Sequence, residues 1–250
     1  MSTSWLLIFV LPFTLNACGR SESPPPGSPQ ASGSRGTGQA GTPTRPSAPG
    51  VTVSGTVKLG GPVPSPHRIS VNKDQAVCGK ETAAEELVVE SGGGVRWAVV
   101  TVEGATARSP GKAVLDQKGC MFVPHVLVVA PGQEIDVLNS DGILHNIHTH
   151  SSKNAAFNMA QPKFKKVITT KFDHPEVVRV NCDVHGWMQG WIVVTDTPAA
   201  VTDADGSFTI PNVPPGEYTA KVWHEGLGER TQEVTVRPDG ATVSFELAKS

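Results

Sequence analysis

Three side chains that can bind a metal stand at three-residue intervals in the stretch NCDVHGWMQGWIVV, residues 181–194. They are Cys182, His185 and Met188, and an apolar run typical of a β-strand follows them. A thiolate, an imidazole and a thioether can ligate a metal ion. A cysteine and a histidine can also act as nucleophile and base, and a buried turn can hold all three without chemistry. The even spacing suits one loop wrapped around one ion, which favours the metal site.

A second source of ligands lies upstream, in the stretch NSDGILHNIHTH, residues 139–150. One thiolate, two imidazoles and a weakly bound axial thioether form the ligand set of a type 1 copper site. The downstream loop supplies all of these except one imidazole. The upstream stretch offers three candidates for it, which are His145, His148 and His150.

The elements around these residues are expected to be short strands. The chain of 250 residues has 26 glycines, 21 prolines and many alternating valine-rich runs, a pattern typical of strands joined by turns. We expect strands at 51–59, 86–91, 96–104, 125–130, 134–141, 176–182 and 190–196, and a short helix within 74–86. The strand that begins near Glu134 is expected to end at His145. Two packed antiparallel sheets are the natural solution for this pattern.

The two motifs together resemble those of the cupredoxins, of the amicyanin and plastocyanin type linked to methylamine utilisation. The likeness rests on HNIH at 145–148 and CDVHGWM at 182–188, and it covers about 120–196. It implies a Greek-key β-sandwich with one type 1 copper ion, held by His145, Cys182, His185 and Met188. It also implies that Asn146 braces the ligand loop by hydrogen bonds and that His185 is the ligand nearest the surface. Gly186, Trp187 and Trp191 would then frame an apolar docking patch.

The upstream ligand can be told from its neighbours by strand geometry. Side chains alternate along a strand, so His148 and His150 should point away from a ligand at His145. A bulge near Ile147 would instead turn His148 inward. A second metal at His148 and His150 lacks an evident third ligand.

Two further cysteines, Cys78 and Cys120, lie outside any ligand pattern. In an exported protein such a pair is expected to form a disulfide. The bridge would close a loop of about 43 residues and stabilise the fold by roughly 4 kcal/mol on the chain-entropy model.

The C-terminal part has a signature of its own. The stretch VTDADGSFTIPNVPPGEYTAKVWHEG, residues 201–226, resembles the carboxypeptidase regulatory-like, or transthyretin-like, β-sandwich module. The stretch VSGTVKLGGPVP, residues 53–64, resembles the opening strand and turn of the same module. We therefore assign 51–198 to the cupredoxin and 199–250 to the module, with the hypothesis that 51 to about 72 pairs with the C-terminal strands.

The first fifty residues are expected to target the protein rather than to fold. Residues 1–17 read as a signal peptide, because their apolar run is shorter than the ~20 residues of a membrane-spanning helix. The residues before Cys18 resemble a bacterial lipobox, which implies lipidation of that cysteine. Residues 18–50 are rich in Ser, Gly and Pro and read as a disordered tether. The chain is thus expected to be a lipoprotein on the periplasmic side of a membrane or on the cell surface.

Together these features predict an all-β electron-transfer protein and not an enzyme. The sequence marks neither an orienting partner nor an oxyanion hole for a nucleophilic Cys182, and the ligand loop lacks the second cysteine of a binuclear copper centre. Expected partners are a redox protein, such as a cytochrome or a dehydrogenase, and a membrane through the lipid anchor. The net charge of −2 does not suggest nucleic acid. The alternatives are a copper carrier or scavenger, and a structural surface lipoprotein without a redox role.

Overall fold

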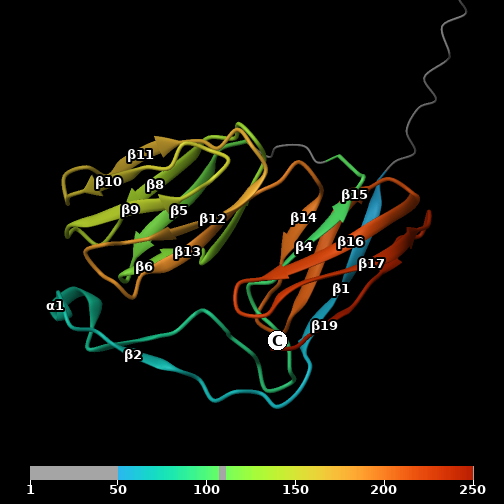
Figure 1. Ribbon diagram of the computed structural model, residues 1–250, viewed down its shortest axis with the longest axis horizontal. Helices are drawn as coiled ribbons and strands as arrows, with labels where there is room; N and C mark the ends of the chain where they lie inside the picture. Colours follow the sequence, from blue (N-terminus) through green and yellow to red (C-terminus); the bar gives the residue numbers. More distant parts are fainter. Residues whose placement is uncertain (1–49, 107–110, 250) are drawn as a thin grey trace, which may run out of the picture. The chain divides into compact units, whose positions relative to one another are not determined.

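Alternating valine-rich segments form two β-sandwiches in the computed structural model, which describes residues 50–106 and 111–249 (Figure 1). The described residues contain nineteen strands and one four-residue helix, α1 (Gln75–Cys78). The predicted all-β fold is therefore confirmed. Within these residues no helix has both the length and the apolar character needed to cross a membrane. The expected signal peptide and Cys18 lie outside the described residues.

The first sandwich is built from consecutive strands in the middle of the chain, and we call it the inserted sandwich. Its larger sheet has the order β10 (Asn158–Gln161), β9 (His145–His150), β12 (Glu176–Asn181), β13 (Gln189–Val194) and β7 (Val126–Val129). Its smaller sheet has the order β11 (Val167–Thr170), β8 (Ile135–Asn139), β5 (Ala113–Lys118) and β6 (Met121–Val123). Inward-facing residues of both sheets form one core, among them Leu115, Val137, Ile147 and Val180.

The second sandwich joins the two ends of the described chain, and we call it the terminal sandwich. One sheet has the order β15 (Ser207–Val213), β1 (Val51–Leu59) and β18 (Ala241–Thr242), with β19 (Phe245–Leu247) also paired to β1. The other has the order β14 (Ala199–Val201), β4 (Val99–Glu103), β16 (Gly216–His224) and β17 (Gly228–Val236). Its core includes Val53, Val100, Val222 and Phe245. The chain leaves this sandwich after β4, builds the inserted sandwich, and returns at β14.

The sheets divide the chain differently from the boundary expected after residue 198. β1 pairs with β15, β18 and β19, whereas β2 (Arg68–Ser70) pairs with β3 (Glu81–Ala83). β4, expected in the cupredoxin, lies between β14 and β16. The reason is packing, because Val100 and Val102 face the core of the terminal sandwich.

Two other strand predictions were wrong in detail. Residues 86–91 form no strand, and an isolated bridge joins Val89 to Val95 across the glycine-rich turn. The strand from Glu134 does not end at His145. β8 ends at Asn139, Gly142 turns the chain with φ 70°, and His145 begins β9. The expected short helix is α1, and β4 starts only after Trp97, whose positive φ of 67° interrupts the strand.

The segment between β1 and β4 carries β2, α1 and β3, and Figure 1 shows it reaching α1 before the chain returns to β4. Val71 and Cys78 of this segment are buried in the core of the inserted sandwich. The predicted disulfide is confirmed, since Cys78 is bonded to Cys120 with a sequence separation of 42. The segment is thus fixed covalently to the inserted sandwich.

Removal of this disulfide should destabilise the protein, while Cys182, His145 and His185 still bind copper. The double variant Cys78→Ala and Cys120→Ala should lose about 4 kcal/mol of unfolding free energy, because the denatured chain regains the entropy of a loop of about 43 residues. Urea denaturation of both proteins measures the loss. An unchanged free energy of unfolding, or loss of copper binding from a folded variant, would contradict this prediction.

A buried ion pair joins the two sandwiches. His125 is only 3 % exposed and hydrogen-bonds Glu225 of the terminal sandwich. Its other ring nitrogen lies 3.4 Å from Glu85. Burial lowers the pKa of His125, but the hydrogen bond with Glu225 and the nearby carboxylate of Glu85 outweigh burial and raise the pKa to about 9. The positively charged ring of His125 thus compensates the negative charges of the Glu225 and Glu85 carboxylates.

This pair should make stability fall in alkaline solution. The folded pKa of His125 is about 9 against 6.5 for the ordinary group. Its contribution, on the order of 3 kcal/mol, is therefore complete below pH 6.5 and is lost as pH rises through 9. Urea denaturation across this range measures the slope. His125→Gln should flatten it, whereas His67→Gln, at an exposed histidine, should not. Equal slopes in wild type and His125→Gln would refute the assignment.

Candidate metal centre

The loop that carries three of the predicted ligands connects β12 to β13. Cys182 follows the last residue of β12, and Met188 precedes the first residue of β13. The backbone N–H of Cys182 donates to the carbonyl of Met188 at 3.1 Å, and that of Met188 donates to the carbonyl of His185 at 2.9 Å. The antiparallel pair of strands and these two bonds fix the loop at both ends.

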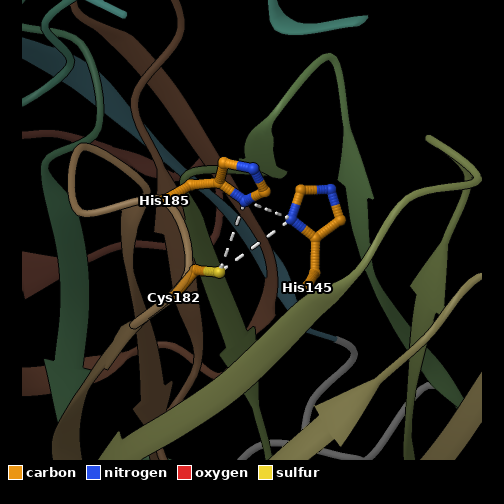
Figure 2. Close-up of side chains that lie close together, drawn as sticks. All are labelled: His145, Cys182 and His185. Atoms are coloured by element: carbon orange, nitrogen blue, oxygen red, sulfur yellow. Dashed lines mark hydrogen bonds between the residues drawn. The ribbon is translucent and has the colours of Figure 1, made fainter. Parts of the chain in front are cut away.

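His145 reaches the same place from the neighbouring strand β9. The Nδ1 atom of His145 lies 3.0 Å from Nδ1 of His185, and the two lie 3.9 and 3.8 Å from the sulfur of Cys182. Figure 2 shows both rings turning these nitrogens toward each other and toward the sulfur. All three side chains are buried, with exposed fractions of 0 % or 1 %.

The outer nitrogens of both rings are engaged by carboxylates. Nε2 of His145 lies 2.9 Å from Asp141, and Nε2 of His185 lies 2.9 Å from Asp74. Since a carboxylate oxygen accepts hydrogen bonds, Nε2 is assigned the proton in each neutral ring, and Nδ1 keeps its lone pair. Burial lowers the pKa of His145 against the opposing bond with Asp141, which favours the neutral ring.

With both Nε2 atoms engaged by carboxylates, the two Nδ1 atoms, 3.0 Å apart, and the sulfur of Cys182 are the ligand atoms that face one another. Imidazole nitrogen and thiolate sulfur suit copper or zinc. A second group, formed by Cys120, Asp141 and His145, is less suited, because the sulfur of Cys120 belongs to the disulfide.

Asn146 connects β9 to the loop. Its side-chain oxygen accepts the backbone N–H of Asp183 at 2.7 Å and that of Val184 at 3.3 Å. Its own backbone N–H points at the sulfur of Cys182 at 3.5 Å. These contacts hold the sulfur and the first half of the loop against β9.

The other predicted residues are placed as follows. Met188 is fully buried and packs in the core that also holds Cys182. The register of β9 with β10 runs without a shift from His145 to His148. His148 therefore points away from the three-residue cluster and hydrogen-bonds Asp183 at 3.1 Å, and exposed His150 hydrogen-bonds Asn181. Their rings lie 4.4 Å apart.

His185, expected to be the ligand nearest the surface, is fully buried like the other predicted ligands, and Asp74 contacts its outer nitrogen. Trp191 was expected in a docking patch, but it packs edge-on against Trp223 of the terminal sandwich at 5.2 Å. Sequence reasoning also missed Asp74 and Asp141. Asp141 could have been found, since it lies four residues before His145.

The fold and the site thus define an all-β protein of two sandwiches with a buried His-Cys-His cluster. The family model of the carboxypeptidase regulatory-like domain matches residues 192–248, which confirms the resemblance proposed for the C-terminal part. A search of curated proteins found no match.

Several solved structures resemble part of the chain. A copper-containing nitrite reductase from Thermus scotoductus SA-01 is 21 % identical over 37 % of this chain, with a TM-score of 0.32, and the match spans only 24 % of the reductase chain. A purple cupredoxin from Nitrosopumilus maritimus is 19 % identical over 33 % of this chain and 99 % of its own, with a TM-score of 0.29. An oxidized amicyanin mutant is 20 % identical over 38 % of this chain and 98 % of its own, with a TM-score of 0.32. These TM-scores are low, so the function is inferred from the geometry of the His-Cys-His cluster.

Proposed function

We propose that this chain is a type 1 copper-binding electron-transfer protein that is exported and anchored to a membrane. One observation carries the proposal. The sulfur of Cys182 and the Nδ1 atoms of His145 and His185 converge within 3.9 Å in a buried site, and each Nε2 atom contacts a carboxylate. This is the equatorial ligand set of type 1 copper. Met188 would be the weak axial ligand.

The chain's own residues suit electron transfer. Copper, when bound, supplies one-electron chemistry between Cu(I) and Cu(II). The closed loop and Asn146 hold Cys182 and His185 against β9, so the ligands can keep nearly one arrangement in both oxidation states. Burial excludes water from the ligand atoms. A carrier that must release copper would gain from a more open site.

The partner would be a redox protein, such as a cytochrome or a dehydrogenase. The anchor is proposed from the lipobox-like residues before Cys18 and the polar tether of 18–50. Mass spectrometry of the mature chain tests the anchor, since lipidation adds the mass of acyl chains to the fragment that begins at Cys18. An unmodified fragment would refute it.

A visible spectrum of the copper-loaded full-length protein tests the function. We expect an intense thiolate-to-copper band that disappears on reduction and returns on oxidation while the copper is retained. Copper that is lost at each reduction would instead identify a carrier. A folded protein that binds no copper would identify a structural role and overturn the proposal.

A further inference from the structure

Asp74 occupies an unusual position at the start of α1. It is the residue before the helix, where an aspartate ordinarily accepts a backbone N–H of the first turn. Among the described residues its side chain makes no such capping bond, and its backbone adopts the left-handed conformation with φ 48°. Its carboxylate instead lies 2.9 Å from Nε2 of His185, which is 111 residues away in the sequence. The side chain of Asp74 thus contacts the candidate copper ligand His185 and does not cap the helix.

The disulfide holds Asp74 in this position. The carbonyl of Asp74 accepts the backbone N–H groups of Val77 and Cys78, each at 2.9 Å, and Cys78 is bonded to Cys120. The carbonyl of Cys120 accepts the indole N–H of Trp187 at 3.1 Å. The Trp187 ring lies 5.2 Å from the ring of His185. The covalent bridge therefore joins the segment of Asp74 to the residues around the imidazole that it contacts.

The same bridge connects the second carboxylate to the site. Asp141, which contacts Nε2 of His145, also accepts the backbone N–H groups of Gly119 and Cys120 at 2.6 and 2.8 Å. Asp141 is thus fixed by the backbone beside it. Asp74 is 40 % exposed and reaches the site only through its own segment. It can therefore be changed with less damage to the inserted sandwich.

We propose that Asp74 is a positioning residue for the copper centre, which orients His185 and lowers the reduction potential. The inference rests on the proposed function. The carboxylate accepts Nε2–H and so directs the Nδ1 lone pair toward Cys182. Its negative charge also makes the imidazole a stronger donor and favours Cu(II) over Cu(I).

Spectroelectrochemical titration of the copper-loaded full-length protein tests whether the negative charge of Asp74 lowers the reduction potential. Asp74→Asn keeps an acceptor for Nε2–H and tolerates a left-handed backbone, but it removes the charge. We expect about a tenfold shift toward Cu(I) at a given applied potential, which for one electron is a rise of about 59 mV. Glu81→Gln is the matched control, because it removes a charge from the same segment at a residue that contacts Arg68. An unchanged potential in Asp74→Asn, or an equal rise in both variants, would overturn the proposal.

A metal-free measurement keeps this test separate from that of the proposed function. Nitrogen NMR reports which nitrogen of the neutral His185 ring carries the proton. We expect Nε2 in wild type and Asp74→Asn, and a mixture in Asp74→Ala, which has no acceptor. The same tautomer in wild type and Asp74→Ala would refute the positioning role. Absence of a copper band in wild type would refute the proposed function and the effect on potential, while the NMR result would still decide whether Asp74 orients His185.

Discussion

Cys182→Ser should abolish the visible thiolate-to-copper band completely, which is the largest effect we expect from any single substitution. Both imidazoles face the sulfur of Cys182. Among the described residues, Cys182 is the cysteine that forms no disulfide. A serine hydroxyl is a hard, weakly acidic ligand and cannot replace a thiolate toward copper. Titration with Cu(II), followed by the visible spectrum, measures the loss.

The substitution should leave the fold in place, since serine and cysteine are similar in size and the site lies at the end of β12. Circular dichroism and urea denaturation check this point. The disulfide variant of Cys78 and Cys120 is the matched control, and it should retain the band although it is less stable. If the band survives in Cys182→Ser, the copper is bound elsewhere and the site assignment is wrong.

The central part of this site could be predicted because its geometry is local. Cys182 and His185 lie in one short loop, so their spacing alone brings the sulfur and the imidazole close together. The alternation of a strand then separates His145 from His148 without any knowledge of the rest of the fold. The course of β9 follows this rule, with His145 buried and His148 partly exposed.

The contact between Asp74 and His185 could not be predicted, because it joins distant parts of the chain. Asp74 meets His185 across 111 residues, and only the path of the disulfide-bound segment brings them together. In the sequence, Asp74 is one of many aspartates and precedes a helix of four residues. The family likeness covers about 120–196 and so does not include the segment of Asp74.

The assignment of β4 failed for a related reason. Its valines alternate as in any buried strand, and this pattern does not say which core they enter. Val100 and Val102 face the terminal sandwich, and Val99 packs in the smaller cluster between the two sandwiches together with Val126 and Val193. A strand that is buried on both faces is therefore compatible with either sandwich, and only tertiary packing decides between them.

The second large effect is expected at the upstream ligand. His145→Gly should weaken copper binding by at least about a hundredfold, because it removes an equatorial nitrogen while Cys182, His185 and Met188 remain. Added imidazole should restore the band. The vacated space is lined by Asp141, whose carboxylate stays fixed by the N–H groups of Gly119 and Cys120 and can accept the N–H of a free imidazole. Titration with imidazole at constant copper, followed by the visible spectrum, measures the rescue.

The matched control is His148→Gly, which removes the same side chain from the other face of β9. It should leave the band nearly unchanged, because His148 contacts Asp183 at the surface and the register of β9 with β10 has no shift between His145 and His148. Rescue by imidazole in His148→Gly, with normal colour in His145→Gly, would mean that His148 is the ligand. That result would require β9 to bulge near Ile147 when copper binds. It would overturn the assignment of His145 while leaving Cys182 and the copper proposal intact.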